Sequence, residues 1–312
     1  MKTLLKLVFA IAIMAWLFGQ GKLDFTKLWA TFSDPKIVAS VVFMLGIQIL
    51  IGTYRWKKLL ELKSKVPLDF FTLTKIQWIG QFFSSALPGA VTGDLIKLTY
   101  IKKIDETMTN RYLLFSVLFD RIIGLSALLF IAGIGSLVYY NDLIHLTPKM
   151  HQVIKVNLIF LVLSLGFIAI FFIPRKLSTK IITVVKIKKI QDLLHQIWAI
   201  ADKRNEVIKA FLVSLVAHGL SISAFYLINM NFFEGDIGIK DLATIIPLGQ
   251  VAVALPISPA GLGVGHVAYE NLFRFLGQNN GATLFNNFWF YAMFVNILGV
   301  IPYLMLTNKK KD

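Results

Sequence analysis

The stretch SSALPGAVTGD, residues 84–94, breaks an otherwise apolar segment that runs from Leu73 to Leu98. A second apolar segment, Leu242 to Leu276, is broken in a similar way by LPISPAGLG at residues 255–263. Proline removes a backbone donor and clashes with the preceding helical turn, whereas glycine relaxes the backbone. Neither segment therefore predicts a straight helix. The candidate hinge residues are Pro88, Gly89, Gly93, Pro256, Pro259, Gly261 and Gly263.

The chain as a whole has the composition of a helical membrane protein. Of its 312 residues, 56% are hydrophobic and only 16% are charged, and the mean hydropathy is +0.70. A soluble domain usually carries about 25% charged residues, so this chain lacks the polar surface to cover a water-soluble globule. The absence of cysteine excludes disulfide frameworks, thiolate metal sites and cysteine nucleophiles.

Six uninterrupted apolar segments predict membrane spans, and with the two broken segments they predict an all-α, polytopic protein. We expect a single domain over residues 1–312. The first segment resembles a signal peptide, but the Gly-Gln-Gly that follows is not an Ala-x-Ala-like cleavage site, so we expect an uncleaved span. The six segments are Leu4–Phe18, Ile37–Tyr54, Tyr112–Tyr140, Val153–Ile173, Val207–Phe232 and Leu284–Leu306.

The distribution of basic residues predicts how the chain crosses the membrane. Irregular backbone survives at membrane depth only where protein or water shelters it, so we interpret the segments near 73–98 and 242–276 as re-entrant or broken helices. If both return to the side they came from and the N-terminus is cytoplasmic, 24 of the 32 Lys and Arg residues are cytoplasmic. Full crossings would move the basic stretch 175–204 outside, against the positive-inside bias. We therefore expect a multi-pass protein of the cytoplasmic (inner) membrane with both termini cytoplasmic.

The net charge of +15 favours an anionic membrane surface over nucleic acid in so apolar a chain. Between residues 175 and 203, apolar residues recur at roughly helical spacing and lysines fill other positions. This pattern predicts an amphipathic helix on the cytoplasmic surface. An ordinary connector is the alternative, and the β-branched residues of 181–190 weaken the helical signal.

The two broken segments echo each other. Gly80-Gln81 precedes Leu87-Pro88 in the first, and Gly249-Gln250 precedes Leu255-Pro256 in the second. Paired broken helices of opposite orientation are typical of a transporter binding site near the membrane midplane. Two unrelated kinks that only ease helix packing are the alternative.

Four motifs in order resemble the flippase-like integral membrane family, which is the family of the transmembrane region of lysylphosphatidylglycerol synthases. They are YRWKKLL at 54–60, LPG at 87–89 with GD at 93–94, DRIIGL at 120–125 and PAGLG at 259–263. The resemblance covers nearly the whole chain and implies a protein that moves lipids or lipid-linked groups between leaflets. Thr92, Lys97 and His266 depart from residues usual in the family, which leaves the head group open. We expect no aminoacyl-transfer domain, so the resemblance does not imply lysine transfer.

Charged residues within apolar segments are candidates for the substrate site. A charge at the bilayer centre costs about 2.5–3.5 kcal/mol on insertion scales, so such groups pair or line a wet path. Asp94 and Lys97 are three residues apart and share a helix face, whereas Asp120 and Arg121 point about 100° apart. We expect cross-pairing of Asp94 with Arg121, or of Lys97 with Asp120. Arg would suit a lipid phosphate; a purely structural ion-pair cluster is the alternative.

Further polar candidates line the broken segments or follow them. Gln81, Ser84, Gln250 and Ser258 could hydrogen-bond a head group or satisfy freed backbone groups. His266 and Glu270 share a helix face, where they could serve a proton-coupled step or form an interfacial polar stripe. His218 lies within a span, as a functional group or as a neutral histidine bonded between helices.

The function that we predict is passive or ion-coupled movement of an anionic or glycan-linked lipid between the leaflets. A membrane enzyme acting on lipid-linked sugars or phosphates, or a scaffold that transports nothing, remain alternatives. We expect no metal, because the histidines lack ligand spacing, and no nucleotide cofactor, because no phosphate-binding loop is present. The expected partners are membrane lipids; the oligomeric state stays open.

Overall fold

The computed structural model describes residue 29 and residues 31–86, 92–184, 187–201, 203–230, 237–254 and 261–308. Within these ranges the chain forms helices joined by loops, without strands, so the predicted all-α class is confirmed. The first predicted span, Leu4–Phe18, lies outside the described residues.

The other five predicted spans are confirmed as long apolar helices, and the protein is a multi-pass membrane protein. Their mean hydropathy is 1.7 or more over an 18-residue window, and each is long enough to cross a bilayer. They are α3 (Pro35–Leu60), α6 (Asn110–Val138), α8 (Met150–Ile170), α11 (Arg204–Asn229) and the pair α14 (Gly281–Ile297) and α15 (Val300–Asn308).

Local sequence explains where these helices begin. The Asp34 carboxylate accepts hydrogen bonds from the backbone N–H groups of Lys36 and Ile37, and Pro35 occupies the first turn of α3. Thr109 caps α6 by accepting from the N–H of Tyr112. Both caps satisfy donors that the first helical turn leaves free.

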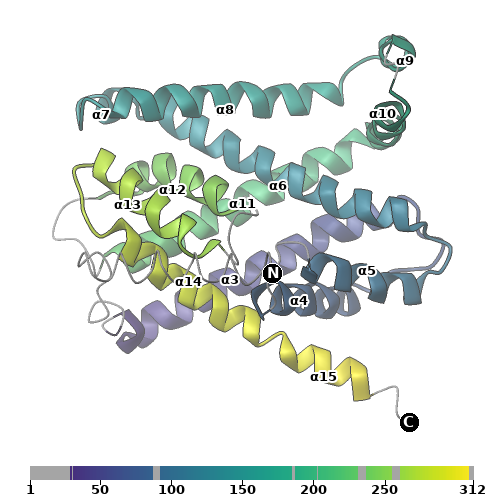
Figure 1. The fold of residues 1–312 in the computed structure, drawn as a ribbon, viewed down its shortest axis with the longest axis horizontal. Helices are drawn as coiled ribbons and strands as arrows, with labels where there is room; N and C mark the ends of the chain where they lie inside the picture. The colour runs from purple at the N-terminus through teal and green to yellow at the C-terminus, as the bar shows by residue number, and fades with distance from the viewer. Residues whose placement is uncertain are drawn as a thin grey trace, which may run out of the picture.

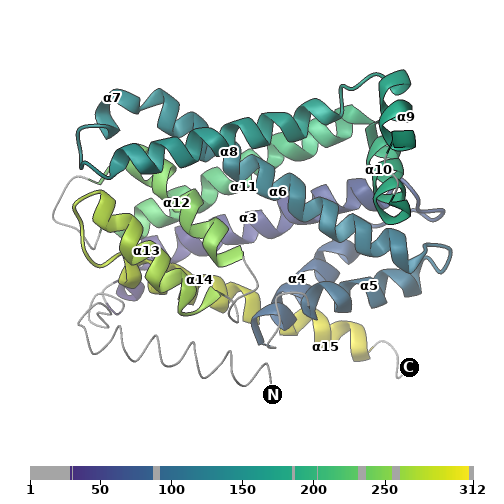
Figure 2. The same ribbon diagram turned by 45° about the horizontal axis from the view of Figure 1, so that its top comes forward.

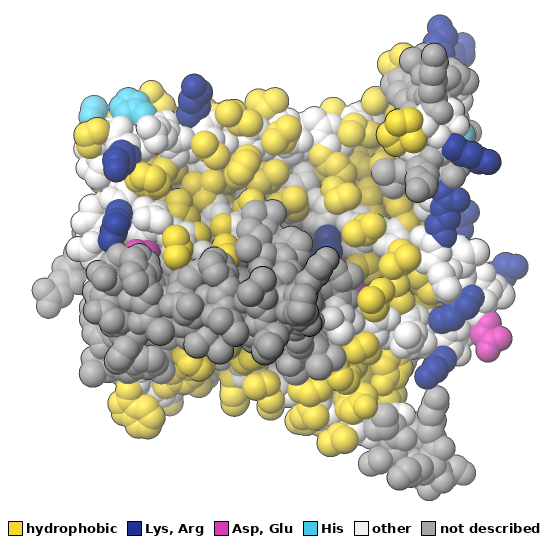
Figure 3. All heavy atoms as spheres, in the orientation of Figure 1, with side chains coloured by type: hydrophobic (Ala, Val, Ile, Leu, Met, Phe, Trp, Pro, Cys, Tyr) yellow, Lys and Arg dark blue, Asp and Glu magenta, His cyan; other side chains and the backbone are white. Residues whose placement is uncertain are grey.

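The long helices run side by side between two ends of the molecule (Figures 1 and 2). One end, which we call the basic end, carries loop 61–69, loop 105–109, α9 (Arg175–Val184) and α10 (Lys188–Ala201). The opposite end carries α7 (Tyr140–Leu143) and loop 276–280. In Figure 3, Lys and Arg gather at the ends, mainly the basic end, and hydrophobic side chains cover the sides between them.

The sides of the bundle expose large apolar residues. Phe43, Val162 and Leu212 are each more than half exposed. Such a surface would favour association in water, whereas lipid tails are an apolar solvent for it. The exposed belt therefore agrees with the membrane assignment.

The two broken segments fold as two helix pairs. The first is α4 (Phe70–Ala86) with α5 (Thr92–Ile104), and the second is α12 (Ile239–Ala254) with α13 (Val264–Phe275). The helices of each pair pack against each other. Figure 1 shows the first pair in the half of the bundle with the basic end and the second pair in the other half. We call them the first and second hairpins.

Part of each predicted hinge lies outside the described residues. Pro88 and Gly89 fall in the connection 87–91, and Pro256, Ser258 and Pro259 fall in the connection 255–260. The glycines that follow are described. Gly261 and Gly263 have φ angles of 74° and 79°, a left-handed backbone that favours glycine.

Glycines set the close contacts within both hairpins. A Cβ on Gly93 of α5 would lie 1.9 Å from the carbonyl oxygen of Gly80 on α4, and a Cβ on Gly80 would lie 2.6 Å from the Lys97 side chain. In the second hairpin, a Cβ on Gly249 would lie 2.4 Å from the ring of Tyr269. The two glycines of the sequence echo, Gly80 and Gly249, therefore both face the partner helix of their own hairpin.

Polar contacts hold α6, which carries Asp120 and Arg121, against α8. Asn157 donates to the Ser136 hydroxyl at 2.8 Å and to the Thr244 carbonyl at 3.0 Å. Gly133 of α6 allows α8 to approach closely, because a Cβ added to Gly133 would lie 2.3 Å from the Cβ of Leu161 on α8. Small residues and interhelical hydrogen bonds are the usual means of helix association in lipid.

The segment predicted as amphipathic forms α9 and α10, which pack against each other at the basic end (Figures 1 and 2). Nearby, Asp105 fixes two loops by accepting from the N–H of Lys65 at 2.9 Å and from Thr107. The hydrogen bonds from Thr107 and Lys65 lower the pKa of Asp105 to about 2. The basic end is therefore ordered by local polar contacts.

Candidate functional site

A cavity with both polar and apolar side chains in its wall is lined by both hairpins and by the spans α3, α6, α11 and α14. Its main part has a volume of about 630 Å³ and an adjoining part about 290 Å³. The two parts share lining residues from α4, α6, α12 and α14, namely Gln81, Arg121, Ala254, Phe288, Ala292 and Asn296. Four helices thus meet at the junction of the two parts.

The sequence echo places one glutamine from each hairpin in this cavity. Gln81 follows Gly80 on α4, and Gln250 follows Gly249 on α12; both glutamines line the main part. Successive residues of a helix point about 100° apart, so a glycine facing the hairpin partner leaves the next side chain free to face the cavity. Ser84, also predicted, lines the smaller part.

A cluster of three charges joins the first hairpin to α6. Lys97 lies 2.8 Å from Asp94, and the Arg121 guanidinium donates to the other oxygen of the same carboxylate. Lys97 also donates to Gln77 at 3.0 Å and lies 4.7 Å from the centre of the Trp56 ring. The predicted pairing of Asp94 with Arg121 is therefore made, and Asp94 holds two cations.

The alternative pairing, Lys97 with Asp120, is not made. Asp120 instead binds Arg55 of α3 through two parallel hydrogen bonds, with Nη2 to Oδ2 at 2.8 Å. Arg55 also donates to Ser214 of α11 at 2.8 Å. Gly124 makes room for the guanidinium, because a Cβ there would lie 3.0 Å from it. This pair ties α3, α6 and α11 together beside the cavity.

The rest of the polar lining consists mainly of uncharged groups. Gln250 donates to Ser221 at 2.6 Å, and Asn296 donates to Ser85 at 2.9 Å. His218 lies 2.9 Å from the Gly124 carbonyl, so it bonds between helices while also lining the cavity. The Nε2 of Gln48 is buried without a hydrogen-bond partner. These groups give the cavity amide and hydroxyl donors and acceptors.

His266 and Glu270 lie elsewhere, between α13 and α14. His266 is fully buried, with Nδ1 accepting from the Gly263 N–H and Nε2 next to Asn286, both at 3.3 Å. Glu270 is 3% exposed, accepts from the Ala282 N–H at 3.3 Å and lies 3.5 Å from Arg274. Neither residue lines the cavity. Their burial disagrees with an interfacial stripe, and their contacts stabilise the start of α14.

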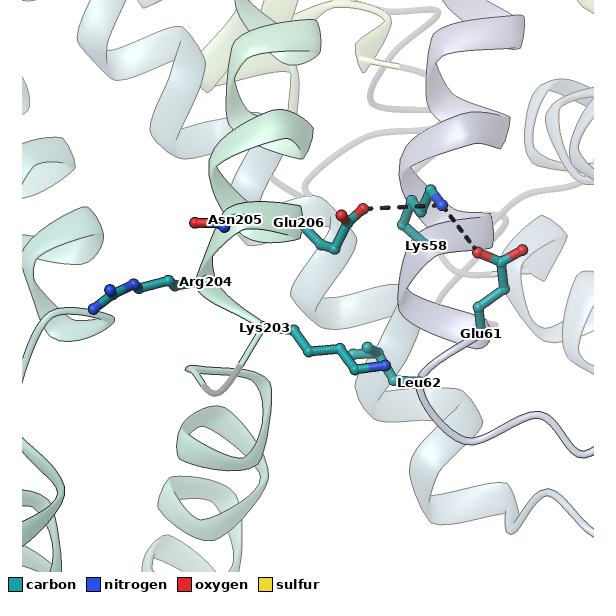
Figure 4. A pocket seen from close by; sticks show the side chains of 7 residues that line it. All are labelled: Lys58, Glu61, Leu62, Lys203, Arg204, Asn205 and Glu206. Atoms are coloured by element: carbon teal, nitrogen blue, oxygen red, sulfur yellow. Dashed lines mark hydrogen bonds and ion pairs between the residues drawn. The ribbon is translucent and has the colours of Figure 1, made fainter.

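A separate open hollow of about 780 Å³ lies at the basic end, between the end of α3 and the start of α11. Figure 4 shows Lys58 between Glu61, at 3.3 Å, and Glu206, at 3.9 Å, while Arg204 points away. Of the described residues, three cations, Lys58, Lys203 and Arg204, and two carboxylates, Glu61 and Glu206, line this hollow. It is open to the surface and lies apart from both hairpins. Within the described ranges, no group of three His, Asp or Glu side chains could hold a metal ion.

Comparison with known families decides the identity of the fold. The family described as "Lysylphosphatidylglycerol synthase TM region" matches residues 3–297, nearly the whole chain. The chain belongs to this family. None of the curated proteins matches the chain.

The motifs by which the chain resembles the lysylphosphatidylglycerol synthase transmembrane family meet around the cavity. The first motif supplies Arg55, the second supplies Asp94, and the third supplies Asp120 and Arg121. The fourth supplies Gly261, which lines the smaller part. Residues far apart in this family member thus converge on one site.

Sequence reasoning missed several lining residues of this family member. Arg55 precedes Lys57 and Lys58 and was therefore grouped with the cytoplasmic cations, although it is buried against Asp120. Its position next to an aromatic residue, Trp56, at the end of an apolar run was the available signal. Gln48, Gln77 and Asn296 lie in long apolar runs, where an isolated amide is itself a hint of an internal polar surface.

Proposed function

We propose that this protein moves lipids with anionic or glycan-linked head groups between the leaflets of the cytoplasmic membrane. The observation that carries the proposal is a cavity that contains a set of polar side chains and has an apolar, open edge. The edge is formed by Leu118, Ile122 and Leu125 of α6, which line the cavity and are each more than two fifths exposed. A lipid could place its head among the polar groups and leave its acyl chains along α6.

The hairpins support the same proposal. They contribute Gln81 and Gln250 from opposite halves of the bundle, as expected for paired broken helices at a midplane site. In this proposal residues 1–312 form one domain, the hairpins are re-entrant, and the basic end with both termini is cytoplasmic. The family name, which refers to a synthase of a modified phospholipid, agrees with a lipid-related role.

The geometry favours transport over the enzymatic alternative. In a membrane hydrolase or transferase, Asp94 and Asp120 would be the candidate acidic pair. A catalytic acid or base must be free to exchange a proton with the substrate. Asp120 is held by the fork of Arg55, and Asp94 by Lys97 and Arg121. Both carboxylates are thus engaged as counterions.

Reconstitution into liposomes tests the proposal. Lipids with a fluorescent acyl-chain label are included in both leaflets, and dithionite is added outside to reduce the exposed label. We expect bleaching beyond the outer-leaflet fraction in proteoliposomes and not in protein-free liposomes. The double variant Gln81→Leu/Gln250→Leu should reduce this extra bleaching. The control His151→Gln should not, because His151 is exposed on α8 and does not line the cavity. Bleaching at the protein-free level for every anionic, zwitterionic and glycan-linked lipid tested would refute the proposal.

A further inference from the structure

Within the described residues, two cations share one carboxylate beside the cavity. Arg55 and Asp120 form one neutral pair. Asp94, in contrast, is shared by Lys97 and Arg121. Arg55 and Arg121 are the charged side chains among the described lining residues.

Of the two cations that share Asp94, Arg121 is the one that lines the cavity. Its side chain is 48% exposed, whereas those of Asp94 and Lys97 are 9% and 8% exposed. Arg55 has both its counterion and Ser214 and is 14% exposed. If Arg121 turned from Asp94 toward a ligand, Lys97 would still neutralise the carboxylate at 2.8 Å. Arg121 can therefore exchange partners without leaving a buried charge uncompensated, which is the costly outcome.

The uncharged lining indicates the rest of the ligand. Gln48, Gln81 and Gln250 offer amide groups within the main part, and Ser221 adds a hydroxyl. Amide and hydroxyl groups match the hydroxyl oxygens of a polyol or sugar. Among the described residues, both carboxylates beside the cavity, Asp94 and Asp120, already bind a cation, which disfavours a cationic head group.

Resting on the proposed function, we propose that the head group is a phosphodiester with one negative charge, joined to an uncharged polyol or sugar, and that Arg121 binds its phosphate. The planar fork of Arg matches two phosphate oxygens. Asp94 holds Arg121 before a lipid binds, and Lys97 keeps its contact with Asp94 when the phosphate replaces Asp94 as the partner of Arg121. Lys97 is thus a positioning residue, and Arg121 is the residue that selects the charge of the lipid.

A binding experiment separates this proposal from transport. The detergent-solubilised full chain is titrated with phosphatidylglycerol, phosphatidylethanolamine and a cationic trimethylammonium lipid, and binding is measured from the rise in thermal unfolding temperature. Soluble glycerol phosphate is a fourth arm, which tests whether the phosphate alone suffices. We expect phosphatidylglycerol to bind at least about tenfold more tightly than the trimethylammonium lipid, which has no phosphate for Arg121 to bind. Phosphatidylethanolamine keeps the phosphate but should bind more weakly than phosphatidylglycerol, because its ammonium adds a positive charge beside Lys97 and Arg121. Glycerol phosphate should bind more weakly than the lipid.

Variants on α6 connect the selectivity to Arg121. Arg121→Gln should abolish the preference for phosphatidylglycerol, and Arg121→Lys, which keeps the charge without the fork, should weaken it. Arg111→Gln, the same substitution in an exposed residue at the basic end of α6, should leave it unchanged. If Arg121→Gln fails to fold, the lipid panel on the unmodified protein and on Arg121→Lys still decides.

The outcomes distinguish the two proposals. Equal binding of the three lipids, or preference for the cationic one, overturns the charge assignment even if liposomes show transport. Tighter binding of glycerol phosphate than of the lipid also overturns it. Selective, Arg121-dependent binding without leaflet movement supports the charge assignment and refutes the transport proposal instead.

Discussion

Arg55 and Asp120 show how a single pair of residues can hold three helices. The pair is buried among α3, α6 and α11, and the Arg55 side chain adds a hydrogen bond to Ser214. Desolvation makes such a pair a weak source of net stability, whereas loss of one partner leaves a buried charge. Removing one partner of the pair should therefore lower the stability of the protein more than replacing both partners with apolar residues.

We expect Asp120→Asn to lower the free energy of unfolding by about 3–5 kcal/mol, because Arg55 is then buried without a counterion. The double variant Arg55→Met/Asp120→Leu should recover most of the loss. Asp142→Asn is the control, since Asp142 and Lys240 form an exposed pair, and such pairs contribute about 0–1 kcal/mol. Reversible unfolding in mixed micelles measures all three. An effect of Asp120→Asn no larger than that of Asp142→Asn would contradict the structural role.

Only part of this charge arrangement could be predicted from the sequence. The spacing of Asp94 and Lys97 fixes their contact, because residues three apart on a helix are neighbours. Arg121 could be matched with Asp94 as one of two pairings. Arg55 lies 65 residues from Asp120, so its pairing depends on how α3 crosses α6, which local pattern does not encode.

At the scale of elements, glycines decide how closely the two helices of each hairpin can pack. Gly93 on α5 faces the Gly80 carbonyl, and a Cβ there would approach it to 1.9 Å. Backbone cannot yield as a flexible side chain can, so the helices would have to separate. Separation would also move Asp94, in the next position along α5, away from Arg121.

Gly93→Ala should therefore lower stability by about 1–3 kcal/mol, as overpacking does, and reduce lipid movement in liposomes. Gly46→Ala on α3 is the matched control, because a Cβ there meets no atom within 4 Å. Alanine in a helix is favoured over glycine by roughly 0.5–1 kcal/mol, so the control should be neutral or stabilising. Thermal unfolding in detergent and dithionite accessibility give the two readouts. Equal behaviour of the two variants would show that the hairpin tolerates the added methyl group.

The positions of the helices could be predicted from the sequence, whereas the contacts between them could not. Long apolar runs predicted α3, α6, α8 and α11, because a bilayer demands helices of that length and composition. Prolines and glycines located the breaks between the hairpin helices. The burial of His266 and Glu270 between α13 and α14 was not predictable, since a polar stripe on one helix looks the same whether water or another helix covers it.

For the molecule as a whole, the two hairpins occupy opposite halves of a bundle whose spans run between a basic and a less basic end (Figures 1 and 3). This arrangement brings four sequence motifs to one cavity. If both hairpins are re-entrant, as proposed, it also determines which loops share a side of the membrane. If a hairpin crossed the membrane completely, every later loop would change sides.

Cysteine labelling therefore tests the architecture directly, because the chain has no cysteine of its own. Glu106→Cys, after the first hairpin, and Lys176→Cys, at the start of α9, should react with a membrane-impermeant maleimide from the same side. His145→Cys, before α8, and Asn279→Cys, after the second hairpin, should react from the other side. All four positions are exposed, so failure to react from one side reports the membrane rather than burial. Reaction of His145→Cys and Asn279→Cys from opposite sides would show that the second hairpin crosses the membrane. Reaction of Glu106→Cys and Lys176→Cys from opposite sides would show that the spans α6 and α8 do not return the chain to its starting side. The lipid path between opposed hairpins would not survive either result.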